Sequence, residues 1–112
     1  MQLHERPYGE TVVVDLHGPV ARESGDTVHL VATLKRLVAA GYKVILLNVA
    51  ELTSIDSVIL GAIAQAHTTA VRSGATLKLV NVSDRLRELL VITKLDRFIP
   101  TVESEEAELD AD

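Results

Sequence analysis

The stretch Val44 to Gly61 (VILLNVAELTSIDSVILG) decides the fold, because it joins a strand to a helix through a short loop. Lys43 to Val49 (KVILLNV) is β-branched and too short for an independent helix, so we expect a central buried strand there. Ala50 to Ile55 would be the outgoing loop. Asp56 can cap the free backbone N–H groups of a helix that begins after it, and Ser57 then falls at about the first helical position with an exposed hydroxyl.

The chain after this point completes this helix and continues with two strands and one more helix. The helix after Asp56 ends at Ser73-Gly74, and its inward face is predicted from helical spacing to hold Leu60, Ile63, Ala64, His67 and Val71. Thr76 to Val80 (TLKLV) has the composition of a strand, and Ser83 is a good cap for a third helix. A short last strand is expected within Phe98 to Val102.

The chain before the central strand contains a second buried strand and a first helix. Thr11 to Leu16 (TVVVDL) is β-branched and apolar, and a Gly-Pro pair stops it. Leu3 to Tyr8 fits an edge strand before it. Helical spacing from Gly25 to Gly41 predicts a helix, with Asp26 or Thr27 as its cap.

Helices placed between successive strands predict an α/β domain with right-handed crossovers where the strands are parallel. The expected order is β-β-α-β-α-β-α, followed by a short strand. The 112 residues fit one domain, which we place at residues 1–102. Hydrophobic residues make up 47% of the chain but aromatic residues only 3%, so Val, Leu, Ile and Ala must fill the core.

The net charge of −5 is concentrated in residues 103–112 (ESEEAELDAD), which hold six of the 16 acidic residues and none of the 11 basic ones. The preceding body therefore has 11 basic against 10 acidic residues, a balance of +1. A nearly neutral body gives no reason to expect a nucleic-acid partner. We expect the acidic tail to be mobile, except for a short helix around Glu105 to Leu109.

Several protein classes are disfavoured by what the sequence lacks. No apolar run approaches the roughly 20 residues that span a bilayer, and no secretory signal is visible, so we expect a cytoplasmic protein without membrane insertion. No cysteine, metal-ligand spacing or glycine-rich phosphate loop is present, so neither a metal nor a cofactor is expected. No set of nucleophile, base and oxyanion donor can be assembled, which argues against an enzyme. The four histidines are scattered at His4, His17, His29 and His67.

Ser57 is the residue best placed to carry a function. A phosphate added there would meet the positive end of the helix dipole, so the fold could tolerate it. A protein docked against the helix start would meet roughly two new negative charges and could be released. On position alone, an Asp-Ser pair is more often an ordinary helix start than a phosphorylation site.

Resemblance to a known family adds to this argument. The run Val44 to Gly61, together with Leu77 to Leu95 (LKLVNVSDRLRELLVITKL), resembles the STAS domain, the module shared by sulphate transporters and anti-sigma factor antagonists. The resemblance covers roughly Tyr8 to Val102, and its later stretch is most similar to stand-alone bacterial antagonists. It implies a mixed sheet of four to five strands, helices mainly on one face, and a phosphorylatable serine at the start of the second helix, here Ser57.

The resemblance also implies a mechanism of partner switching. An antagonist of this kind binds an anti-sigma factor that is also a serine kinase, and so frees a sigma factor for transcription. The kinase ends the interaction by phosphorylating the serine, and a serine phosphatase restores it. By this resemblance Ser57 is the phosphoacceptor, Asp56 is its neighbour in the motif, and the loop after Gly18 forms the docking face together with the second helix. Asp26, expected near Ser57 at the same end of the sheet, is a further candidate contact.

The motif departs from the family pattern. The family sequence Asp-Ser-Ser-Gly-Leu-Gly is Asp56-Ser57-Val58-Ile59-Leu60-Gly61 here, and a strand-end acid, often Asp, is Asn48. Val58 and Ile59 would either narrow access to Ser57 or enlarge an apolar contact with the partner. The alternative is therefore an unphosphorylated STAS scaffold subunit of a stress-signalling or lipid-transport assembly. Nothing in the sequence favours one oligomeric state.

Overall fold

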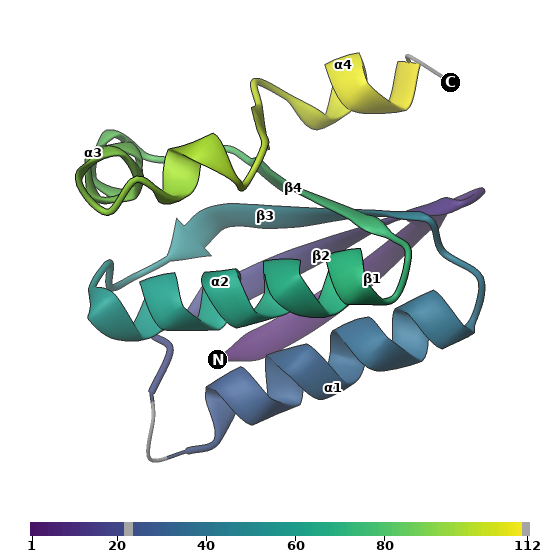
Figure 1. Cartoon of the computed structure of the whole chain (residues 1–112), viewed down its shortest axis with the longest axis horizontal. Helices are drawn as coiled ribbons and strands as arrows, with labels where there is room; N and C mark the ends of the chain where they lie inside the picture. The colour runs from purple at the N-terminus through teal and green to yellow at the C-terminus, as the bar shows by residue number, and fades with distance from the viewer. Residues whose placement is uncertain (22–23, 111–112) are drawn as a thin grey trace.

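The computed structural model describes residues 1–21 and 24–110 and shows a five-stranded sheet between layers of helices (Figure 1). The order of elements is the predicted one, with a 3₁₀ turn added after the third helix. The elements are β1 (Gln2–Tyr8), β2 (Thr11–Gly18), α1 (Asp26–Ala39), β3 (Val44–Leu52), α2 (Ser57–Arg72), β4 (Thr76–Val80), α3 (Asp84–Ile92), η1 (Leu95–Arg97), β5 (Thr101–Val102) and α4 (Glu105–Asp110).

The strands lie side by side in the order β1-β2-β3-β4-β5. β1 pairs antiparallel with β2, and every other neighbouring pair is parallel, which confirms the predicted mixed sheet. Only Gly9 and Glu10 separate β1 from β2, and Gly9 has the positive φ of 62° that a tight hairpin turn favours. Each parallel pair is joined through a helix, as a crossover between parallel strands requires.

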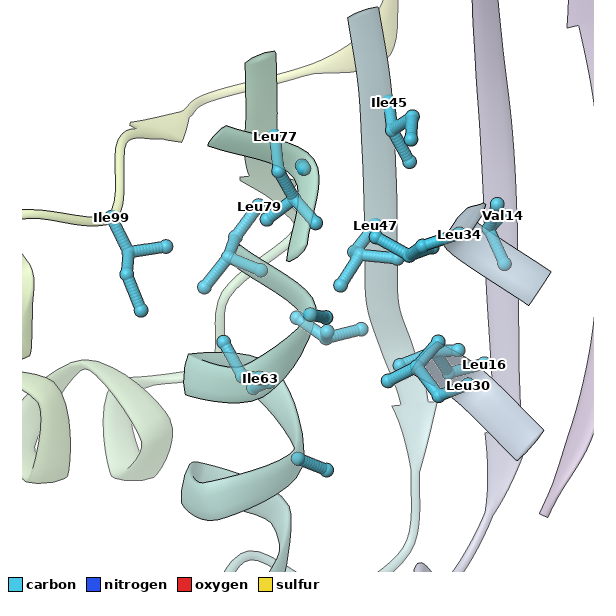
Figure 2. Close-up of a cluster of buried hydrophobic side chains, with 14 of the residues drawn as sticks. Val14, Leu16, Leu30, Leu34, Ile45, Leu47, Ile63, Leu77, Leu79 and Ile99 are labelled. Carbon is cyan, nitrogen blue, oxygen red and sulfur yellow. The ribbon is translucent and has the colours of Figure 1, made fainter. Parts of the chain in front are cut away.

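One face of the sheet, which we call the front, packs against α1 and α2 (Figure 2). Alternate residues along each strand point to this side. The side chains that meet there with no exposed surface include Val14, Leu16, Leu30, Leu34, Ile45, Leu47, Ile63, Leu77 and Leu79. Burying one such side chain contributes roughly 1.5–3 kcal/mol. The front core is therefore the main source of stability.

The opposite face, which we call the rear, is smaller. Val13, Leu46 and Val80 are fully buried there, and Leu109 of α4 packs against them. Figure 1 shows α4 on this side of the sheet, away from α1 and α2. The helices thus lie mainly on one face, as predicted, and α4 corresponds to the short helix expected in the acidic tail.

Three local predictions were wrong. Helix α2 turns Ile63, Ala66 and Ala70 towards the sheet, so Val71, which was predicted on the inward face, is 56% exposed. β3 continues to Leu52, beyond the predicted end at Val49, because its pairing with β2 resumes after a register shift and joins Gly18 to Leu52. The predicted cap of α1 by Asp26 or Thr27 is replaced by Gly25, which has a left-handed backbone with φ of 72° and gives no side-chain cap.

Candidate functional site

Ser57 is the first residue of α2, and it is exposed. Asp56 caps the helix, because its carboxylate accepts hydrogen bonds from the backbone N–H groups of Val58 at 3.0 Å and Ile59 at 3.2 Å. Such a cap stabilises a helix by about 0.5–2 kcal/mol. The helix therefore begins where the sequence predicted, with a serine hydroxyl on an ordered and solvent-facing first turn.

The two apolar residues after Ser57 lie in different environments. Ile59 has no exposed surface and belongs to the front core, whereas Val58 is half-buried and packs against the edge of that core. A side chain that points into the core cannot touch a docked protein or cover the hydroxyl of Ser57. Of the two substitutions in the motif, only Val58 therefore changes the surface.

Gly61 lies one turn beyond Ser57 on the same side of α2, because residues at i and i+4 share a helix face. It is exposed, and a β-carbon built on it would meet no atom within 4 Å. Packing therefore does not require glycine here, although glycine inside a helix costs about 1 kcal/mol relative to alanine. The bare backbone beside Ser57 is a flat surface that another protein can approach closely.

Asp26 lies at the same end of the sheet as Ser57, since both residues begin helices that follow parallel strands (Figure 1). Its carboxylate is buried and interacts with nearby backbone groups rather than with Ser57. It accepts a hydrogen bond from the N–H of Ala21 at 2.8 Å and lies 3.4 Å from the amino group of Met1. The Ala21 hydrogen bond is the main reason why the pKa of Asp26 is lowered. Asp26 is thus engaged by Ala21 and Met1 rather than presenting a free charge.

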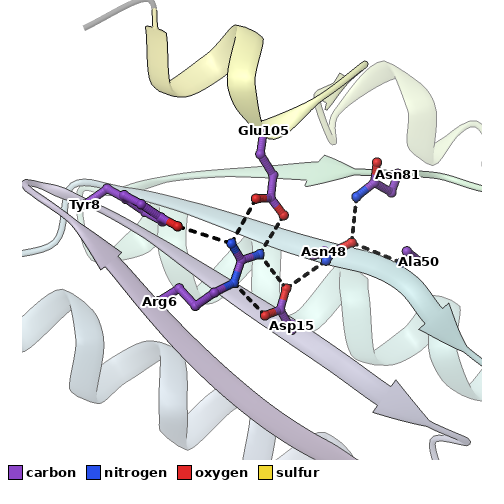
Figure 3. Close-up of polar contacts among 7 residues, drawn as sticks. All are labelled: Arg6, Tyr8, Asp15, Asn48, Ala50, Asn81 and Glu105. Atoms are coloured by element: carbon purple, nitrogen blue, oxygen red, sulfur yellow. Dashed lines mark hydrogen bonds and ion pairs between the residues drawn. The ribbon is translucent and has the colours of Figure 1, made fainter.

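A polar network crosses the rear face beneath α4 (Figure 3). Arg6 of β1 donates to both carboxylate oxygens of Asp15, at 2.7 and 2.8 Å, and to both oxygens of Glu105, at 2.6 and 3.0 Å. These hydrogen bonds raise the pKa of Arg6 above its usual range, and those from Arg6 lower the pKa of Asp15. The network has no local signal in the sequence, because Arg6 and Glu105 stand 99 positions apart.

Asn48 completes the network, and its amide explains one departure from the family pattern. Its Nδ2 donates to Asp15 at 2.7 Å, while its Oδ1 accepts from Asn81 Nδ2 at 2.9 Å and from the N–H of Ala50 at 3.2 Å. An aspartate here would lack the donor and would place a second carboxylate against Asp15. Asparagine is therefore the matched residue, and position 48 belongs to the rear network.

Two of the histidines lie on helices, His29 on α1 and His67 on α2. His29 is exposed, as predicted, and His67 is half-buried on α2, where burial lowers its pKa. Within residues 1–21 and 24–110, no three metal-ligating side chains gather into a candidate metal site. In the same described ranges, no helix has the length and apolar character needed to cross a bilayer.

An apolar groove of about 390 Å³ lies at the far end of α2, between that helix and η1. Its lining includes His67, Val71, Arg72, Leu95, Phe98 and Ile99. Phe98 is 69% exposed at its rim. The groove lies on the C-terminal half of α2, so it is separate from the start of the helix where Ser57 stands.

Comparisons with known proteins agree with this architecture. A family model of the STAS domain matches residues 5–108, while no curated protein sequence matches. TM1081 of Thermotoga maritima, solved by NMR, is 21% identical with a TM-score of 0.80, over 100% of this chain and 91% of that one.

Two further solved structures share the fold. The phosphorylated form of SpoIIAA, a cell fate determinant of Bacillus, is 19% identical with a TM-score of 0.73 over 98% of both chains. An anti-sigma factor antagonist from Mycobacterium paratuberculosis is 16% identical with a TM-score of 0.78, over 98% of this chain and 92% of that one. Because the family match runs from β1 into α4, this chain belongs to the STAS domain family.

Proposed function

We propose that this protein is an anti-sigma factor antagonist that works by partner switching in the cytoplasm. Its unphosphorylated form binds an anti-sigma factor of the serine-kinase type, and phosphorylation of Ser57 ends that complex, which regulates transcription through a sigma factor. A serine phosphatase resets the switch. The observation that carries this proposal is the exposed hydroxyl of Ser57 at the first position of a capped helix. The fold shared with SpoIIAA, solved in phosphorylated and unphosphorylated forms, supports it.

A phosphate on Ser57 would change the surface far more than the fold. The helix dipole favours a negative charge at its N-terminus by about 0.3–1 kcal/mol. The exposed carboxylate of Asp56 next to it opposes this gain weakly, because water and salt screen exposed charges. The net effect on stability should therefore stay within about 1 kcal/mol. A docked protein would by contrast lose its contact with the hydroxyl and meet roughly two added negative charges.

The proposed docking surface centres on Ser57 and combines three features. Val58 adds a half-buried apolar side chain, and Gly61 adds bare backbone one turn later. Asp56 holds the first turn in shape through its cap. Asp26 contributes indirectly, because its buried carboxylate accepts a hydrogen bond from the N–H of Ala21 and so fixes Ala21 near the end of β2. Ile59 supports the surface from the core side.

The alternative function is that of an unphosphorylated STAS scaffold subunit of a stress-signalling or lipid-transport assembly. The reason for considering this function is the altered motif after Ser57. The burial of Ile59 weakens this reason, because Ile59 is the larger of the two departures from the family motif and its side chain does not reach the surface. The half-buried side chain of Val58 still favours an enlarged apolar contact with a partner protein.

Pull-down from native lysate tests the proposal, with the wild type compared with Ser57→Ala and Ser57→Asp. Bound proteins are identified by mass spectrometry. Thr68→Asp is the matched control, because Thr68 is exposed on the same side of α2, three turns from Ser57, and receives the same charge. We expect wild type, Ser57→Ala and Thr68→Asp to retain a kinase-like anti-sigma factor and Ser57→Asp to lose it.

Two results would speak against the switch. If all four proteins retain the same non-kinase partner, the scaffold function is correct. If Thr68→Asp loses the kinase as fully as Ser57→Asp, the effect belongs to charge anywhere on α2 rather than to position 57.

A further inference from the structure

The rear face of the sheet carries an ordered row of side chains that the proposed switch at Ser57 does not use. Arg6 pairs with Val13, Val13 with Leu46, and Leu46 with Lys78, across four neighbouring strands. Cross-strand partners point to the same face. The row therefore sets two apolar side chains between two cations, whose strands lie about 14 Å apart at roughly 4.8 Å per strand.

Helix α4 covers this row with complementary side chains. Glu105 binds Arg6 through two hydrogen bonds at 2.6 and 3.0 Å, and Glu108 pairs with Lys78. Leu109 packs against the apolar residues between these cations. The spacing of i, i+3 and i+4 places the three on one side of a helix, and Glu106 and Ala107 are exposed.

Helix α4 should detach from the sheet more easily than the other elements of the fold. α4 has six residues, too few to be stable as a helix without support. Only Glu103 and Ser104 separate it from the two-residue strand β5, and its contacts with the sheet and its two ion pairs hold it in place. The four charged side chains of these pairs are between 18% and 29% exposed, so salt can weaken them. Detachment would expose Val13, Leu46 and Val80 together with both cations.

We propose that the row from Arg6 to Lys78, which we call the rear site, is a second docking surface whose ligand is an acidic amphipathic protein segment. The segment it fits carries two acids three residues apart with an apolar residue directly after the second, as in Glu105, Glu108 and Leu109. α4 is the resident occupant and keeps the site closed. A partner segment of the same pattern displaces α4 and takes over both cations. This inference does not depend on phosphorylation of Ser57.

A binding measurement on the full chain tests the rear site. The probe is a fluorescent, end-capped peptide of residues 103–110, followed by anisotropy. The double variant Glu105→Gln/Glu108→Gln releases α4, and Glu103→Gln/Glu106→Gln is the control, because it removes the same charge from two exposed residues. The tethered α4 competes at a high effective concentration in the wild type. We expect the release variant to bind the peptide at least tenfold more tightly than either the wild type or the control.

Three results would overturn the proposal. The first is equal peptide binding by the wild type, the release variant and the control. The second is peptide binding by the release variant that persists when Lys78→Gln is added. The third is a wild type that sediments with twice the mass of one chain and loses this doubling in Lys78→Gln. The last result would mean that tails are exchanged between two copies. Should the release variant fail to fold, hydrogen exchange of α4 amides decides. The α4 amides should exchange several-fold faster in Lys78→Gln, which removes the cation, than in Lys78→Arg, which keeps it. Equal exchange rates in the two variants would refute the rear site.

Discussion

The front and rear faces of the sheet are built from alternate residues of the same strands, yet they are held in different ways. The front core joins the sheet to α1 and α2 mainly through aliphatic side chains. The rear face has three fully buried aliphatic residues and depends on the network around Arg6, Asp15 and Asn48. The comparison indicates that the front specifies a rigid fold, while the rear holds a short helix through contacts that other acidic groups can replace.

Leu46 and Leu47 offer the largest test of this comparison, because they are neighbours in β3, are both fully buried and point to opposite faces. Core leucine-to-alanine changes cost about 2–5 kcal/mol, and the cost is higher where the surroundings cannot collapse. We expect Leu47→Ala to fall near the top of this range and Leu46→Ala near the bottom, because α4 can settle into the space. Urea unfolding measures both, and equal losses would contradict the comparison.

Asn48→Asp tests the rear network and should have the next largest effect. The change removes the hydrogen bond to Asp15 and sets two carboxylates together, which should cost about 1–3 kcal/mol in the free energy of unfolding. Because repulsion makes one carboxylate of the pair easier to protonate in the folded state than in the unfolded state, the difference from wild type should shrink as the pH falls towards about 4. A loss below about 0.5 kcal/mol at neutral pH would show that the network contributes little.

Asp56→Ala should lower stability by about 1 kcal/mol, because two N–H groups at the start of α2 lose their acceptor. Asp56→Asn keeps an acceptor oxygen and should be close to wild type. Thermal unfolding of the two variants separates the cap from the charge. An equal loss in both would mean that the charge, rather than the cap, stabilises the helix.

The smallest effect concerns pH and His67. Burial lowers the pKa of His67 below its ordinary value of about 6.5, so the folded state binds fewer protons than the unfolded state just below that pH. Stability should therefore fall as the pH drops from about 6.5, and His67→Gln should flatten this part of the profile. The pKa of Asp15 is also lowered, so its contribution is present above the ordinary carboxylate range and lost only in stronger acid. An unchanged slope in His67→Gln would contradict the assignment.

Most of the fold could be predicted because each element has a local signal. The strand Thr76–Val80 was predicted with its observed bounds, and Asp56 and Ser83 cap their helices as expected. The end of β3 could not be predicted, since pairing with β2 rather than local composition carries it to Leu52.

The candidate site was predictable only in part. The position of Ser57 follows from the cap and from the helical spacing beyond it. The separate environments of Val58 and Ile59 depend on the rotation of α2 over the sheet, which the altered motif alone does not reveal. The rear site joins Arg6 to Lys78 through the sheet register, and the packing of α4 then brings Glu105 to Arg6, so no local signal in the sequence links these residues.

The most direct test of the central claim is the phosphate occupancy of Ser57 in protein isolated from its native cells, measured residue by residue by mass spectrometry. Ser54, which is half-buried in the preceding loop, is the internal control. We expect phosphate on Ser57, at a level that changes with growth conditions, and none on Ser54. Ser57 unmodified under every condition, in cells where the protein is abundant, would contradict the switch.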